Sequence, residues 1–134
     1  MKRIVILLLV ITCITGCSRG ENTATYRVVT GVQVDYTRQG DTIHREYTKP
    51  VSMQSILTYL RILNPYGPVY PDGSSDIMCK IVLHYSQGPD SVYIQQGQRF
   101  LQKDGGSWEN IDPSRASLLY PMLLLLPSDG GIEN

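Results

Sequence analysis

The sequence predicts an α+β fold, in which an antiparallel β-sheet carries two helices on one face. Strand-like segments alternate apolar and polar residues with period two. Two other segments have apolar residues at helical spacing, and short runs of turn residues separate the strands. The expected order along the chain is ββα, then a meander of three or four strands, then α. Because the strands have one apolar face, both helices are expected to cover that face.

Residues 26–37 are expected to form the first strand. Its polar face holds Arg27, Gln33, Asp35 and Thr37, and a turn at 38–41 leads into a returning strand at 42–47. The apolar face of the first strand is predicted to comprise Tyr26, Val28, Val32, Val34 and Tyr36.

A helix is predicted over residues 51–63. Pro50 suits the first turn of a helix, and Asn64 ends it because it precedes Pro65 and so disfavours the helical region. The apolar stripe of this helix consists of Met53, Ile56, Leu57, Leu60 and Leu63.

Residues 64–75 are expected to form a loop, which would be long for a compact domain, and such loops are often functional. Tyrosine offers a rigid contact surface at low entropic cost. Tyr66, Pro68, Tyr70 and Asp72 are therefore candidates for a recognition loop. The alternative is a structural crossing from helix to sheet, with the two tyrosines packed on the edge of the domain.

A meander is expected next, with strands at 76–86, 91–95, 98–103 and 107–110 separated by Gly-containing turns. In the first of these strands Cys79 shares a face with Ile77, Ile81 and Leu83. A free cysteine usually packs as a small apolar residue, so we expect Cys79 in the core. A reactive or intermolecular thiol is the alternative.

The last helix is expected to begin at Asp112, as N-cap, followed by Pro113. Residues 118–126 are apolar on nearly every side. Pro121 removes a backbone donor, so it should kink or split the helix. We expect this helix to be buried against the sheet, with a partner-facing or membrane-dipping helix as the alternative.

The sequence offers no recognisable catalytic motif, and its acidic residues are scattered. His44 and His84 are expected on the solvated face of the sheet, and nothing in their spacing indicates a metal site. Asp72 to Asp76 indicates a turn without the EF-hand pattern. We therefore predict no enzyme, no cofactor and no metal.

Charge is balanced, with 12 basic and 12 acidic residues. No basic stripe is present, so we expect no nucleic-acid partner. The equal numbers of basic and acidic residues do not indicate any other class of partner.

The N-terminus has the pattern of a targeting segment. Lys2 and Arg3 precede an apolar run over residues 4–11, which is too short for a spanning helix of roughly 20 residues but suits a signal peptide. The segment ends Ile14-Thr15-Gly16-Cys17, which resembles the lipobox of bacterial lipoproteins. That resemblance implies cleavage before Cys17 and a lipid on its thiol.

Alternatives to Cys17 remain open. Cys13 is a second cysteine in the same segment, but it would leave a shorter apolar run. An ordinary secretory signal cleaved near residues 16–18 would give a free protein, and an uncleaved anchor is a third possibility. Ser18 after the cysteine implies outer-membrane sorting in an organism with two membranes.

The expected organisation is a signal peptide (1–16), the lipidated Cys17 with a tether (17–25), one domain (26–126) and a flexible tail (127–134). We expect an extracytoplasmic lipoprotein, anchored in a bacterial membrane through Cys17. Its small non-enzymatic domain would bind a protein or an envelope polymer. A small-molecule or metal-binding envelope module is the alternative, and a cell-envelope enzyme is a third hypothesis.

Overall fold

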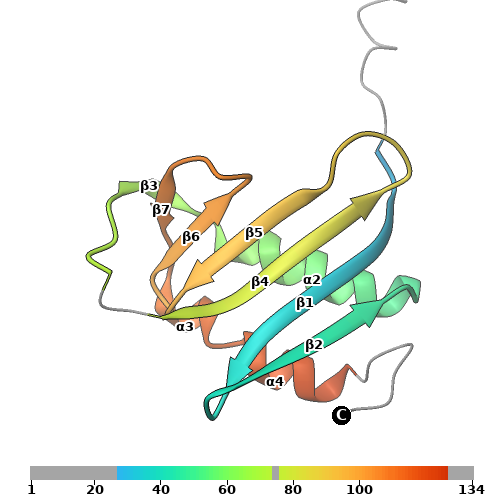
Figure 1. Cartoon of the computed structure of the whole chain (residues 1–134), viewed down its shortest axis with the longest axis horizontal. Helices are drawn as coiled ribbons and strands as arrows, with labels where there is room; N and C mark the ends of the chain where they lie inside the picture. Colours follow the sequence, from blue (N-terminus) through green and yellow to red (C-terminus); the bar gives the residue numbers. More distant parts are fainter. Residues whose placement is uncertain (1–26, 74–75, 127–134) are drawn as a thin grey trace, which may run out of the picture.

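The computed structural model describes residues 27–73 and 76–126, which form one antiparallel sheet with helices on one face (Figure 1). The predicted α+β class is confirmed. The strands lie in the order β2-β1-β4-β5-β6-β7-β3. Their bounds are β1 Val29–Arg38, β2 Asp41–Tyr47, β3 Tyr66–Val69, β4 Ile77–Tyr85, β5 Ser91–Gln96, β6 Phe100–Lys103 and β7 Trp108–Asn110. The helices are α2 Pro50–Leu63, α3 Pro113–Ala116 and α4 Leu119–Leu125.

The N-terminal hairpin and the meander are joined into one sheet by β1. This strand pairs with β2 on one side and with β4 on the other. Val32 and Val34 point into the core as predicted, but Val28 is 61% exposed. The register between β1 and β4 shifts between Val29 and Gly31, so the alternation of faces does not extend to Val28.

A second irregularity, in β4, makes the predicted position of Ile77 on the core face wrong. Its register with β5 shifts between Ile77 and Cys79. A bulge of this kind places two successive residues opposite one partner, and both Met78 and Cys79 lie in the core cluster. Ile77, predicted to share the core face of Cys79, is therefore 57% exposed.

Helix α2 starts at Pro50 and ends where Asn64 adopts a left-handed conformation with φ 42°. It buries Ile56, Tyr59 and Leu63 against the sheet, and Figure 1 shows it crossing behind the strands. The helix was predicted over residues 51–63 and is observed over Pro50–Leu63. It starts one residue earlier because proline is tolerated in the first turn.

The last predicted helix is split into α3 and α4. Asp112 caps α3 by accepting a hydrogen bond from the backbone nitrogen of Ser114 at 2.9 Å. Pro121 is the third residue of α4, in the first turn, where backbone nitrogens have no helical partner. The helix is therefore divided upstream of Pro121. At its position in the first turn of α4, the missing N–H of Pro121 interrupts no helical hydrogen bond. Leu119 and Leu123 are buried.

The core between the helices and the sheet contains a buried cluster of polar side chains around Gln95. Tyr59 donates from its hydroxyl to Oε1 of Gln95 at 2.5 Å. The amide nitrogen of Gln95 donates to the carbonyl oxygen of Gly97 at 3.1 Å, and Cys79 Sγ lies 3.8 Å from Oε1 of Gln95. Burial raises the pKa of Cys79 to about 12. Cys79 is 2% exposed, which supports the predicted packing role.

Candidate functional site

The segment predicted as a recognition loop begins with a strand. Tyr66–Val69 forms β3, which pairs with β7 alone and closes one edge of the sheet. The expectation of a loop over all of 64–75 was therefore wrong. Pro68 has no backbone donor, and proline is tolerated in edge strands. Gly67 has φ +74°, which accommodates the register shift between Tyr66 and Pro68.

The two tyrosines of this segment are exposed. Tyr66 is 59% exposed and Tyr70, just after β3, is 98% exposed. Pro68 and Asp72 are exposed as well. A tyrosine with almost all of its surface in water adds nothing to the core, so the alternative of a packed structural crossing does not describe Tyr70.

The register of the meander brings further apolar side chains to the same edge. Residues that pair from strand to strand form rows across the sheet. One row consists of Ile77, Gln96, Phe100, Asn110 and Tyr66. A second row consists of Ile94, Gln102, Trp108 and Val69. The row between them contains the buried Cys79, Gln95 and Leu101. Because faces alternate along a strand, the first two rows lie on the outer face, opposite the helices.

We call Tyr66, Tyr70, Phe100 and Trp108 the aromatic edge. Phe100 and Trp108 are partly buried, while the neighbouring Ile77 is 57% exposed. Aromatic residues are enriched where proteins bind partners. Sequence reasoning found the two tyrosines and missed Phe100 and Trp108, because only the strand register shows that Phe100 and Trp108 share the outer face with Tyr66.

The other half of the outer face is polar. Asp35 and Glu46 both bond to the His44 ring, Glu46 Oε1 at 3.3 Å. The hydrogen bond with Asp35, and then that with Glu46, raises the pKa of His44 above its ordinary value. His84 forms its own pair with Asp90, Nδ1 to Oδ2, at 2.9 Å.

The two histidines do not meet. His44 pairs with Asp35 of β1, whereas His84 pairs with Gly31 on the other side of β1. The two positions are about 13 Å apart along the strand and two strand spacings across it, so they cannot bind one metal ion together. Among residues 27–73 and 76–126 no group of three or more His, Cys, Asp or Glu side chains could hold a metal.

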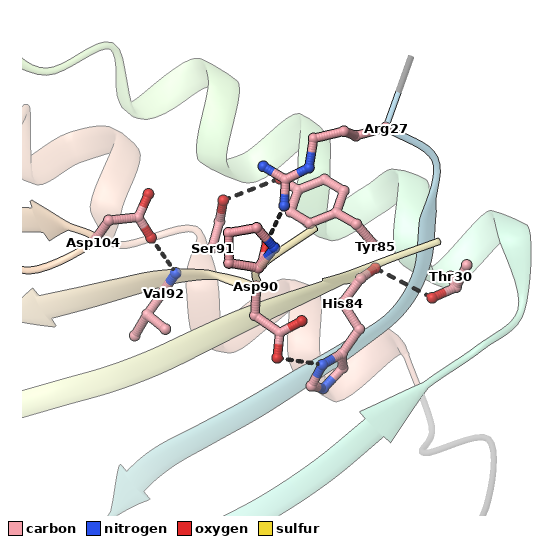
Figure 2. A network of polar contacts seen from close by, with 9 residues as sticks. Arg27, Thr30, His84, Tyr85, Asp90, Ser91, Val92 and Asp104 are labelled. Atoms are coloured by element: carbon pink, nitrogen blue, oxygen red, sulfur yellow. Dashed lines mark hydrogen bonds and ion pairs between the residues drawn. The ribbon is translucent and has the colours of Figure 1, made fainter. Parts of the chain in front are cut away.

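Arg27, at the start of the described chain, contacts the end of β4 and the loop between β4 and β5. Figure 2 shows the Arg27 guanidinium against the ring of Tyr85, with Cζ 3.8 Å from the ring centroid. Arg27 also donates to the carbonyl oxygens of Gln87, at 3.2 Å, and of Pro89. These contacts fix the point at which the chain enters the sheet.

Two hollows lie beside α4. One, of about 360 Å³, lies between α4 and the turn of the β1–β2 hairpin and is lined by Tyr36, Thr37, Arg38, Gln39, Tyr120, Leu123 and Leu124. The other, of about 340 Å³, is a groove between α2 and α4, and includes Thr58, Tyr59, Leu118 and Met122.

The lipobox residues Ile14, Thr15, Gly16 and Cys17 lie outside the described residues, as do the tether and the predicted flexible tail at 127–134. In the part of the chain that the structure describes, no helix has the length and apolarity to cross a membrane. Comparison with protein-family models, with curated proteins and with solved structures found no match to the chain.

Proposed function

We propose that the protein is a membrane-anchored extracytoplasmic lipoprotein, cleaved before Cys17, and that its domain binds a protein or an envelope polymer through the aromatic edge. The observation that carries the binding proposal is the exposure of Tyr70 (98%) beside Tyr66 (59%). The lipobox motif at 14–17 supports the anchor.

The chemistry of the aromatic edge favours contact over catalysis. A tyrosine ring offers a large apolar surface and a hydroxyl that can form a hydrogen bond, and it has few rotatable bonds to immobilise on binding. β3 is short and contains Pro68, which disfavours pairing of the free strand edge with another chain. Recognition would therefore depend on the side chains.

The position of the edge also supports the proposal. β1, where the chain enters the sheet, and β3 are separated by four strands in the sheet order, about 24 Å at the usual strand spacing. Figure 1 shows β3 and the start of β1 on opposite sides of the sheet. An anchor at Cys17 would thus leave the aromatic edge accessible.

The test is capture by the full lipidated protein. It is extracted in mild detergent, immobilised, and incubated both with membrane extracts and with isolated cell-wall sacculi. Tyr66→Ala and Tyr70→Ala should each weaken capture by tenfold or more, since central aromatic anchors contribute about 2 kcal/mol or more. Val28→Ala is the control, because Val28 is 61% exposed at the opposite end of the sheet. A ligand bound equally by the tyrosine variants and Val28→Ala would contradict the proposal.

A second candidate function rests on the pocket of about 360 Å³ beside Tyr36, Arg38 and Tyr120. Pockets of this size hold small molecules, and Arg38 would select an anionic group. A thermal-shift screen with small carboxylates and phosphates tests it. Stabilisation that Arg38→Ala abolishes would support this function, and a flat screen would contradict it.

A further inference from the structure

Helix α4 exposes leucine where a surface helix is usually polar. Leu124 is 61% exposed and Leu125 is 80% exposed. From Ala116 to Leu126 the sequence contains no charged residue. Exposed apolar clusters of this kind mark contact with a protein or a membrane.

A third aliphatic residue lies at the same end of the helical layer. Val51, the second residue of α2, is 77% exposed. Tyr47, four positions before Val51, donates from its hydroxyl to the carbonyl oxygen of Leu126 at 3.2 Å. The start of α2 and the end of α4 are therefore neighbours, and we call Val51, Leu124 and Leu125 the aliphatic end.

The aliphatic end lies within reach of the proposed lipid. Tyr47 pairs with Val32 of β1, and Val32 is five residues from Arg27, where the described chain begins. Ten residue steps separate Arg27 from Cys17 and can span at most about 35 Å. A lipid on Cys17 can therefore enter the same membrane surface that the leucines would touch.

We propose that the aliphatic end rests in the interfacial region of the membrane to which Cys17 is anchored. The inference rests on the proposed function, since the lipid keeps the domain at the bilayer. α4 has seven residues, too few to span the hydrocarbon but enough to insert a leucine face into the headgroup boundary. The three exposed residues of the aliphatic end are all aliphatic, whereas tyrosine, tryptophan and arginine dominate protein-protein hot spots.

This contact also sets the orientation of the domain. In Figure 1 the start of α2, the end of α4 and the start of β1 lie toward the right of the molecule, and β3 lies toward the left. With the aliphatic end in the membrane, β3, which begins at Tyr66, lies at the side of the domain away from it.

The experiment places a fluorescent probe at the aliphatic end of the full lipidated protein. Leu125→Cys and, as the matched control, Tyr70→Cys are labelled with a thiol-reactive fluorophore. Cys79 is 2% exposed and its pKa is raised to about 12, so it does not compete for the label. Both proteins are incorporated into phosphatidylcholine vesicles with or without lipids carrying a nitroxide quencher on the acyl chain. The label at Leu125→Cys should lose most of its fluorescence to the quencher, and the label at Tyr70→Cys should lose little.

Equal quenching at the two positions, in a protein that floats with the vesicles, would overturn the membrane contact while leaving the anchor intact. Disulfide formation between unlabelled Leu125→Cys copies, without quenching, would identify a second copy of the chain as the occupant and overturn it too. The mass of the same sample reports the lipid on Cys17 separately. A protein that carries no lipid and does not float would refute the proposed anchor, and the membrane contact with it.

Discussion

Nη1 of Arg45 donates a hydrogen bond to the carbonyl oxygen of Leu123 at 2.8 Å. The same nitrogen lies 3.0 Å from the carbonyl oxygen of Leu126. The last carbonyls of a helix have no partner within it and carry partial negative charge. Arg45, which is 8% exposed, thus connects β2 to the end of α4 through a buried cation.

Replacing Arg45 by methionine should destabilise the protein. The substitution keeps much of the apolar stem but removes a charged donor from two carbonyl oxygens, and hydrogen bonds to charged groups contribute about 1.5–3 kcal/mol. We expect a loss of about 2 kcal/mol in the free energy of unfolding, measured in urea. Arg99→Met is the control, since Arg99 is exposed and should change stability by less than about 0.5 kcal/mol. Similar losses in both variants would refute the role of Arg45.

Tyr59 and Gln95 should stabilise the core as a coupled pair. Their hydrogen bond of 2.5 Å is buried, so Tyr59→Phe leaves the amide oxygen of Gln95 without its phenolic donor. We expect Tyr59→Phe and Gln95→Leu each to cost about 1–2 kcal/mol. The double variant should cost less than the two together, with a coupling energy of about 1 kcal/mol. Additive losses in urea unfolding would show that the two residues act independently.

Cys79 should be unreactive in the folded protein. Only the thiolate reacts, and burial raises the pKa of Cys79 to about 12. At pH 8 a thiol reagent such as Ellman's should not react with the native chain, but should react once urea unfolds it. If Cys17 carries lipid, denaturant should reveal one thiol per chain. Rapid reaction of native protein whose Cys17 carries lipid would contradict the buried position of Cys79.

The same pKa shift predicts a loss of stability in alkali. The unfolded thiol ionises near 9.0 and the folded thiol near 12, so unfolding releases a proton between these values. The contribution is therefore complete below pH 9.0 and declines as the pH rises toward 12. Cys79→Ala should make the fall in unfolding free energy less steep over this range. An unchanged slope would exclude the thiol as its cause.

His44 should titrate above an unperturbed histidine. Asp35 and Glu46 raise its pKa above 6.5, so the protonated form is favoured in the folded chain. The gain in stability is complete below pH 6.5 and is lost as the pH rises through the pKa of the folded protein. Because the side chain is 52% exposed, water screens the interaction and the gain is small.

The test is an NMR titration of the His44 ring, assigned with a His84→Gln variant. Asp35→Asn should lower the pKa of His44 toward 6.5, because it removes the largest cause of the shift. An identical titration curve in Asp35→Asn would contradict the assignment.

The sequence was sufficient for most of the helices and strands. Period-two alternation located β1 and β4, and the turn at 38–41 located β2. Pro121 indicated a kink or split in the last helix, which is divided into α3 and α4 upstream of that proline. These features depend on local chemistry: the face that a side chain occupies and the donor that proline lacks. They can be read from neighbouring residues alone.

The features that were missed depend on distant pairing. β3 contains a glycine and a proline and has no alternation of its own, and it becomes a strand by pairing with β7 about 40 residues later. The bulge that exposes Ile77 exists only in the register with β5. Phe100 and Trp108 join Tyr66 through that same non-local pairing, so half of the aromatic edge could not be predicted from local patterns.

The mass of the intact protein extracted from membranes of its native cells tests the central proposal most directly. The proposal predicts a polypeptide that begins at Cys17 and carries lipid on that residue, and removal of ester-linked acyl chains should lower its mass accordingly. A chain that begins at another residue, or that begins at Cys17 with an unmodified thiol, would contradict it.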